Sequence, residues 1–206
     1  MPTNESPELQ RWNGRFSSSE YVFGTAPNAF LASQAHRFTP GQRALAVADG
    51  EGRNGVALAR QGLDVLSVDF SPVGLAKART LAADAGVTLH TKCVDLATWS
   101  WDEPPFDVVV GIFIQFAGPA FRETIFEKMK HALKPGGLIL LTGYRPEQLA
   151  YKTGGPSQLE NLYTAHMLRD AFSDMTILHL AEHDDGINEG AGHSGMSALI
   201  DLVARK

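Results

Sequence analysis

Short apolar runs alternate with helix-like segments along most of the chain. The runs that predict strands span residues 44–48, 65–69, 87–94, 106–112 and 138–142. The run at 106–112 is nearly continuous and β-branched, which is typical of a strand buried on both faces. Segments with helical spacing begin near residues 29, 54, 72 and 121 and stop before Pro40, Gly62, Gly86 and Lys134. This alternation indicates a parallel sheet with helices on both faces.

The C-terminal part of the chain has a different pattern. Two strand-like runs, 175–183 and 196–204, are joined by a stretch rich in Gly and Asp that leaves no room for a helix. Two strands connected in this way are expected to be antiparallel neighbours. The predicted fold is therefore α/β, a doubly wound, mostly parallel, seven-stranded Rossmann-like sheet that ends in an antiparallel pair.

The chain length favours one domain over residues 1–206. Within it we expect an N-terminal lid and helix in 1–40 and a ligand-binding core in 41–145. Residues 146–206 would hold a substrate-side insertion and the antiparallel strands.

Charge and cysteine content narrow the class of function. The net charge of −5 argues against nucleic-acid binding, which normally needs a basic face. No apolar stretch reaches the length of a membrane span and the N-terminus is polar, so a cytoplasmic location is expected. The single cysteine, Cys93, excludes a disulfide framework and is expected in the core. The histidines lack metal-ligand spacing, so no metal site is predicted.

The junction between the first strand and its helix is a candidate ligand site. It includes Asp49, Gly50, Gly52 and Asn54. Glycines let backbone approach a ligand closely, and the helix N-terminus beyond them presents free N–H groups. A tight turn that merely needs glycine is the alternative interpretation.

Two carboxylates strengthen the ligand interpretation. Asp69 ends the second strand and Asp95 follows the third. In open α/β sheets, ligands bind at this carboxyl edge, and an acidic residue there accepts hydrogen bonds from ribose hydroxyls. A turn or N-cap role for Asp69, near Ser71, is the alternative. The glycine spacing does not match a dinucleotide fingerprint or a triphosphate-binding loop.

The chain resembles the class I S-adenosylmethionine-dependent methyltransferases. The segments that carry the resemblance are 49–54, 68–72, 94–96, 106–109 and 133–137. Segments 50–54, 21–28 and 203–206 make it most similar to the tellurite-resistance and thiol methyltransferase group. One departure is that Ala46 and Ala48 stand where the family usually has an acidic residue and a glycine; Asp49 could supply the displaced carboxylate.

The resemblance implies a cofactor, S-adenosylmethionine, and a set of residues that hold it. Asp69 would hold the ribose hydroxyls, Phe70 would pack on the adenine, and Asp95 would accept from its amino group. The full implied set is Asp49, Gly50, Gly52, Asn54, Asp69, Phe70, Ser71, Asp95, Leu96, Gly111 and Phe113.

The candidate catalytic residues are His193, Arg145 and Tyr21. Related tellurite-type enzymes place a functional histidine near His193, which could orient or deprotonate an acceptor. Arg145 follows the fifth strand, and Tyr21 lies in the aromatic N-terminal segment. Each also has a non-functional alternative. His193 could lie in a surface hairpin, Arg145 could be a solvated loop charge, and Tyr21 could serve packing only.

The predicted activity is methyl transfer to a small soft nucleophile, either a thiol or a chalcogen oxyanion such as tellurite, by a monomer or homodimer. The alternatives are O- or N-methylation of a small metabolite, a non-catalytic S-adenosylmethionine-binding protein and a nicotinamide-dependent reductase.

Overall fold

A seven-stranded sheet forms the centre of the molecule. The computed structural model describes residues 6–190 and 192–206. The strand order is β3-β2-β1-β4-β5-β7-β6, and the strands are β1 (Arg43–Val47), β2 (Asp64–Asp69), β3 (His90–Cys93), β4 (Phe106–Ile112), β5 (Leu133–Tyr144), β6 (Thr176–Asn188) and β7 (Ser194–Arg205). The first five strands are parallel, whereas β7 is antiparallel to β5 and β6. The predicted fold class is confirmed.

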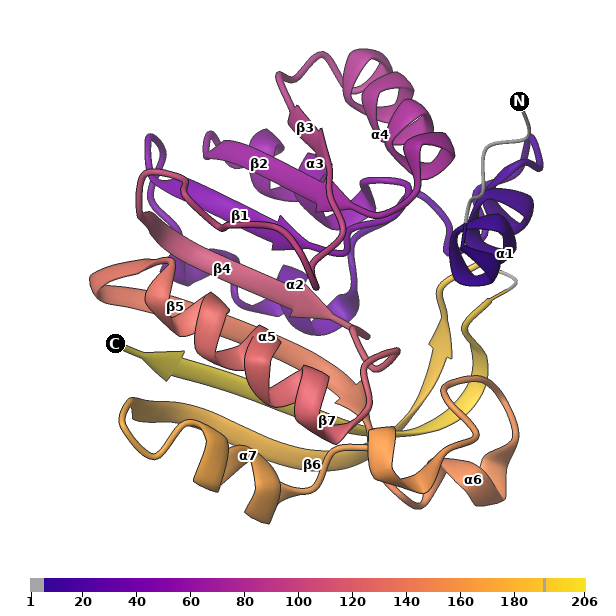
Figure 1. Cartoon of the computed structure of the whole chain (residues 1–206), viewed down its shortest axis with the longest axis vertical. Helices are drawn as coiled ribbons and strands as arrows, with labels where there is room; N and C mark the ends of the chain where they lie inside the picture. The colour runs from indigo at the N-terminus through magenta and orange to yellow at the C-terminus, as the bar shows by residue number, and fades with distance from the viewer. Residues whose placement is uncertain (1–5, 191) are drawn as a thin grey trace.

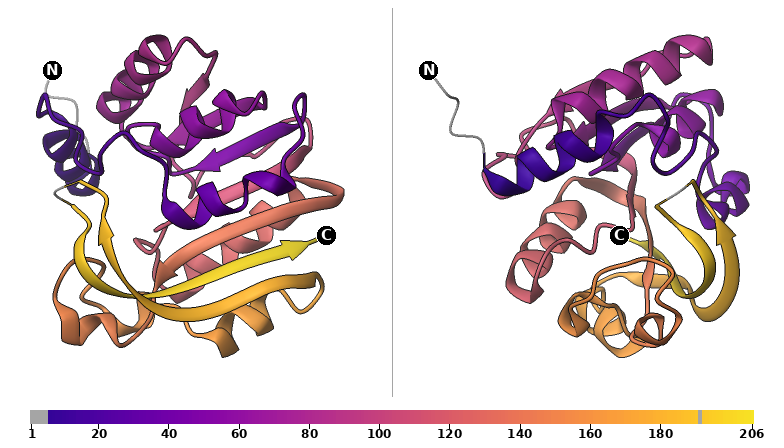
Figure 2. Two further views of the ribbon diagram at one scale, coloured as in Figure 1. Left: turned by 180° about the vertical axis from the view of Figure 1, so that it is seen from behind. Right: turned by 90° about the vertical axis from the view of Figure 1, so that its right-hand side faces the viewer.

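Helices cover both faces of this sheet (Figures 1 and 2). One face carries α5 (Pro119–His131) and α7 (Ala165–Ala171), and the other carries α2 (Ala29–Ser33), α3 (Arg53–Arg60) and α4 (Pro72–Asp84). Side chains alternate across β1, so Leu45 and Val47 join the first apolar core while Ala44 and Ala46 join the second. Short elements η1 (Ala35–Arg37), α6 (Gln148–Tyr151) and η2 (Leu159–Asn161) lie in the connections.

Several predicted boundaries differ from the structure. The strand predicted at 87–94 is limited to His90–Cys93, and Cys93 is exposed because β3 is an edge strand. The strand predicted at 138–142 begins earlier, at Leu133, so residues 134–137 belong to β5, where the pairing register with β4 shifts. The helix predicted from residue 29 to 38 is divided into α2 and η1.

The sequence pattern did not predict the N-terminal helix α1 (Pro7–Phe16). Its start is nevertheless well encoded, because the Ser6 side chain accepts a hydrogen bond from the Leu9 N–H and Pro7 occupies the first turn. Only Phe16 of this helix is buried. Helix α1 packs against α4 at the end of the molecule to which the parallel strands point (Figure 1).

The β6–β7 hairpin is longer than the sequence indicated. Its two strands pair from Thr176↔Arg205 to Asn188↔Ser194, leaving a connection of residues 189–193. The hairpin curves beyond the sheet and brings this tip to the N-terminal segment (Figures 1 and 2). Among the described residues, no helix has the length and apolarity needed to cross a membrane.

Candidate functional site

The loop after β1 shapes the carboxyl edge of the sheet. Gly50 and Gly52 have φ values of +57° and +86°, which glycine adopts without strain. A β-carbon at Gly50 would lie 3.2 Å from the Phe16 ring, so α1 covers this part of the loop. A β-carbon at Gly52 would lie 2.5 Å from that of Ala78, so Gly52 allows α4 to pack closely.

Asp69 links the first two loops of this edge. Its carboxylate accepts hydrogen bonds from the Gly50 N–H at 2.7 Å and the Ser71 N–H at 2.8 Å. Burial raises the pKa of Asp69, and these two bonds oppose the rise. Ser71 in turn caps α4 by accepting from the Gly74 N–H. The carboxylate is therefore held rigidly at the end of β2, with each oxygen able to accept a further bond.

Asp49 occupies a different position, beneath the start of α3. Its Oδ2 accepts bonds from Ser67 Oγ at 2.9 Å and the Gly55 N–H at 3.1 Å. Burial raises its pKa to about 7, although both bonds favour the ionised form. Ala48 immediately before it has φ of +50°, a left-handed conformation that disfavours alanine.

The other predicted cofactor residues flank this edge. Phe70 is half-buried, and Asp95 is exposed, with Oδ1 bound to the Ala97 N–H. Leu96 belongs to the main core. Gly111 is packed among apolar side chains, since a β-carbon there would lie 2.8 Å from both Ile114 and Leu141. Its absence of a side chain thus serves packing within the sheet.

Two buried carboxylates fasten the N-terminal segment across the edge. Glu51, which is 3% exposed, accepts a bond from the Val22 N–H at 2.8 Å and forms an ion pair with Lys77. Lys77 also donates to the carbonyl oxygens of Ser18 and Glu20. These contacts hold the N-terminal segment against α4.

Glu189 is the second of these carboxylates, at the tip of the β6–β7 hairpin. It accepts bonds from Arg53 Nη2 at 2.6 Å and from Asn28 Nδ2 at 2.9 Å. Burial alone would raise its pKa, but the facing His193 ring and Arg53 outweigh burial and lower it to about 2. Asn54 completes the junction by accepting from the Asn28 N–H at 3.0 Å. One carboxylate thus joins the hairpin, the lid and α3.

His193 is enclosed by aromatic rings. Its ring centroid lies 4.6 Å from that of Phe23, 4.4 Å from that of Phe113 and 5.7 Å from that of Tyr144. We call these four residues the aromatic chamber. His193 is only 8% exposed, so it is not a surface hairpin residue. Burial lowers its pKa despite Glu189, whose Oε2 is 3.8 Å from Nδ1, and Nδ1 has no hydrogen-bond partner.

The structure does not bring the other two candidate catalytic residues to this chamber. Arg145 forms ion pairs with Asp184 on β6 and with Glu147. It follows Tyr144 directly and its partners are distinct from those of His193. Tyr21 packs on α4, where its hydroxyl donates to the Lys77 carbonyl oxygen at 3.2 Å.

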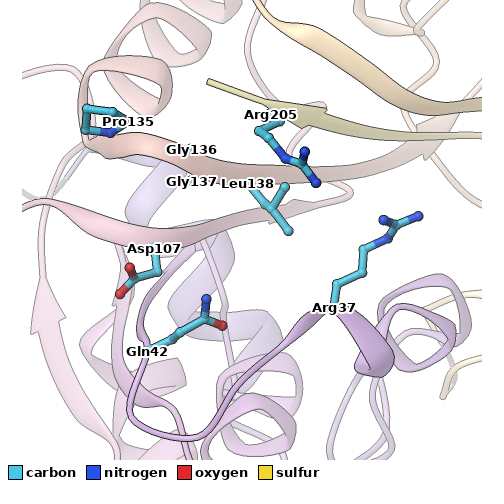
Figure 3. A pocket seen from close by; sticks show the side chains of 8 residues that line it. All are labelled: Arg37, Gln42, Asp107, Pro135, Gly136, Gly137, Leu138 and Arg205. Carbon is cyan, nitrogen blue, oxygen red and sulfur yellow. The ribbon is translucent and has the colours of Figure 1, made fainter.

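A polar cavity of about 440 Å³ lies at the opposite edge of the sheet (Figure 3). It is lined by Arg37, Gln42, Asp107, Pro135, Gly136, Gly137, Leu138 and Arg205. Asp107 there is already paired with Lys134 at 2.8 Å. None of the predicted site residues lines this cavity.

Sequence reasoning missed Glu51, Arg53, Asn28 and Glu189 as site residues. Glu51 and Arg53 stand within the glycine-rich junction, so their place beside a functional loop was a usable signal. Glu189 was separated from its partners by more than 130 positions, and nothing local distinguished it.

Comparison with known proteins shows what this architecture is similar to. Residues 44–137 match the family model described as a methyltransferase domain. This segment runs from β1 to the start of β5 and contains the glycine loop, Asp69 and Asp95. The matched segment makes the chain similar to methyltransferase domains, and the solved structures named below share its fold.

Among curated relatives, the carboxy-S-adenosyl-L-methionine synthase of Geobacter metallireducens is 30% identical over 118 residues, covering 55% of this chain and 46% of that protein. An uncharacterized protein of Mycobacterium tuberculosis is 30% identical over 115 residues, covering 55% and 41%. The match spans less than half the length of these relatives.

Solved structures share the fold across nearly the whole chain. A protein studied for the conversion of a disulfide bond into a thioacetal group during echinomycin biosynthesis has a TM-score of 0.80 at 16% identity, covering 96% of this chain and 91% of that one. TehB from Haemophilus influenzae has a TM-score of 0.72 at 17% identity, covering 97% and 67%. The N-methyltransferase NodS of Bradyrhizobium japonicum, in complex with S-adenosylhomocysteine, has a TM-score of 0.74 at 12% identity, covering 98% and 99%.

Proposed function

We propose that the chain transfers the methyl group of S-adenosylmethionine to a small soft nucleophile, either a thiol or a chalcogen oxyanion such as tellurite. The observation that carries the proposal is the aromatic chamber, in which a buried histidine faces the carboxyl edge of a methyltransferase sheet. When bound, the cofactor supplies a methyl group that its sulfonium already activates.

The residues of the carboxyl edge fit this cofactor. Asp69 is 8% exposed and keeps accepting capacity on both oxygens, as a ribose-binding carboxylate requires. Phe70 and Leu96 would flank the adenine, and Asp95 would accept from its amino group. Gly50 and Gly52 give the loop its positive-φ turns, at which the amino-acid end of the cofactor would approach.

His193 is the residue that would act on the acceptor. Burial keeps its imidazole neutral at neutral pH, and a neutral imidazole has one ring nitrogen that can accept a proton. The ionised Glu189 would then stabilise the imidazolium. A thiolate or oxyanion needs little such help, while a protonated thiol, hydroxyl or amine needs more.

The walls of the chamber favour a soft, weakly hydrated acceptor. Phe23, Phe113 and Tyr144 are aromatic and exclude water, and aromatic faces attract a cationic sulfonium. Such a site contributes to methyl transfer mainly through positioning. The likeness in fold to TehB and to the protein of disulfide-to-thioacetal conversion is compatible with this acceptor class.

Formation of S-adenosylhomocysteine across a panel of acceptors tests the proposal. The panel contains 2-mercaptoethanol, tellurite, selenite, a small alcohol and a small amine. We expect turnover with a thiol or a chalcogen oxyanion, and a loss of turnover of the protonated thiol in His193→Ala. Turnover of the alcohol or amine alone would instead support O- or N-methylation. Cofactor binding with no turnover of any acceptor would support a non-catalytic binding protein.

A further inference from the structure

Arg15 is a cation without a carboxylate partner at the rim of the aromatic chamber. Its Cζ lies 5.3 Å from the Trp12 ring centroid and 4.9 Å from that of Phe23. It forms no hydrogen bond or ion pair with any described residue. Partial burial and the charge of Arg11 lower the pKa of Arg15, and the attraction of Glu51 offsets them only in part.

The other cations of this region are all paired. Arg53 bonds Glu189, and Lys77 bonds Glu51. Arg11, one turn before Arg15 on α1, bonds Glu8 at 2.6 Å and also lies over the Trp12 ring, at 5.2 Å. Arg15 therefore shares the Trp12 contact with Arg11, but differs from it in its missing anion and in its second ring contact, with Phe23.

The hairpin tip holds Arg15 close to His193. A β-carbon at Gly192 would lie 2.9 Å from Nη2 of Arg15, and the Gly192 N–H donates to the Val22 carbonyl oxygen at 3.0 Å. Phe23 contacts both Arg15 and His193. The free N–H groups of the guanidinium consequently lie beside the residue proposed to act on the acceptor.

We infer that Arg15 binds a carboxylate or oxyanion of a ligand held beneath the N-terminal lid. A planar guanidinium, stacked on rings and carrying unused donors, matches such an anion through paired hydrogen bonds. The inference rests on the proposed function and deepens it, because the anion belongs either to the methyl acceptor or to the amino-acid end of the cofactor. Both sources present the same chemistry to Arg15.

Calorimetric titrations that need no turnover test the inference. Wild type, Arg15→Gln, Arg15→Lys and the matched control Arg11→Gln are titrated with S-adenosylhomocysteine and with 5′-methylthioadenosine, which lacks the amino-acid carboxylate. The proteins saturated with S-adenosylhomocysteine are then titrated with 3-mercaptopropionate and with 2-mercaptoethanol, which differ in a carboxylate. Circular dichroism checks that each variant is folded.

We expect Arg15→Gln to weaken one carboxylate-bearing ligand about tenfold or more, while its carboxylate-free counterpart and Arg11→Gln change little. Weaker S-adenosylhomocysteine binding identifies the cofactor as the source of the anion. Weaker 3-mercaptopropionate binding identifies the acceptor. Arg15→Lys should retain part of the affinity, because it keeps the charge and loses the paired donors.

The inference is overturned if Arg15→Gln binds both S-adenosylhomocysteine and 3-mercaptopropionate with wild-type affinity, or if wild type prefers neither of them over its carboxylate-free counterpart. Failure of the proposed function has a different signature, namely the absence of S-adenosylhomocysteine formation with every acceptor in wild type. The titrations remain decisive in that case, since they measure binding alone.

Discussion

The two edges of the parallel sheet carry similar charged residues in opposite settings. At the carboxyl edge, Arg53 and Glu189 pair with side chains that are 7% and 9% exposed. At the amino edge, Arg43 and Asp64 pair at 3.3 Å with side chains that are 28% and 50% exposed. Both edges therefore use ion pairs, but only one edge removes them from water.

This difference in burial decides how much each ion pair can contribute to stability. A buried pair loses hydration that its mutual attraction barely replaces, so it is poor evidence for stability. An exposed pair costs little and contributes about 0–1 kcal/mol. The buried charges of the carboxyl edge are therefore better explained by what they position, which is the lid, the hairpin tip and His193.

The largest expected effect is on catalysis at the carboxyl edge. His193→Ala should lower the rate with a protonated thiol by about 100- to 10,000-fold, the usual contribution of a general base. Cofactor affinity should change little. Because burial lowers the pKa of His193, wild-type activity should fall only below pH 6.5, and this acid limb should disappear in the variant. Steady-state rates across pH measure both effects.

His166→Ala is the matched control, since His166 lies on the exposed side of α7 with its side chain 87% exposed. Equal rates in wild type and His193→Ala at every pH, with each acceptor, would remove His193 from the chemistry.

The next prediction compares the loss of stability when a buried carboxylate, Glu189, or a more exposed one, Asp107, is replaced. Glu189→Gln should lower the free energy of unfolding by about 3 kcal/mol, because Arg53 loses its buried partner. Asp107→Asn at the amino edge, where Lys134 is 41% exposed, should cost about 1 kcal/mol or less. Urea denaturation at pH 7 measures the two. Equal losses would contradict the contrast between the edges.

The pH dependence of unfolding sharpens the same comparison. The pKa of Glu189 falls from 4.5 in the unfolded chain to about 2 in the folded protein. Its contribution, about 3 kcal/mol, is complete above pH 5 and is lost as the pH falls towards 2. Glu189→Gln should therefore flatten the loss of stability over this acidic range. An unchanged slope would show that Glu189 does not titrate as its contacts imply.

The next prediction compares the effect on cofactor affinity of substitutions at the two ends of β2. Asp69→Ala should weaken S-adenosylmethionine binding by about 1–3 kcal/mol, because ribose hydroxyls would be left unpaired. Asp64→Ala, at the amino end of the same strand, should leave the affinity unchanged. Calorimetry measures both. Wild-type affinity in Asp69→Ala would end the ribose assignment.

The sheet could be predicted from sequence, because its signals are local. Strands β1, β2 and β4 are short apolar runs followed by a helix, and the antiparallel pair lacks room for one. Helix α1 escaped prediction because only Phe16 of its ten residues is buried, which leaves little apolar periodicity. The hairpin tip escaped for a different reason. Its function depends on Glu189 meeting Arg53 and Asn28, which are 136 and 161 positions away.

The site could be predicted in part for the same reason. Asp69 and Asp95 follow strands whose ends must share one edge, and the glycine loop marks where that edge begins. Arg145 also follows a strand, yet its side chain forms an ion pair with Asp184 on β6 and does not join the aromatic chamber around His193. Sequence places a residue near an edge, whereas the choice between the two faces of a strand end depends on the partners available there.

The smallest expected effect tests backbone strain at the carboxyl edge. Ala48 and Phe113 follow parallel strands with φ of +50° and +56°, in a region that favours glycine. Ala48→Gly should raise the free energy of unfolding by about 0.5–1 kcal/mol, since the relief of strain exceeds the extra freedom of glycine in the unfolded chain. Ala46→Gly, two residues earlier inside β1, is the matched control and should lower the free energy, because it removes a buried methyl group from an unstrained strand. Urea denaturation distinguishes the two signs. Destabilisation by both substitutions would mean that Ala48 is not strained, and that the loop before Asp49 is held in shape by its contacts alone.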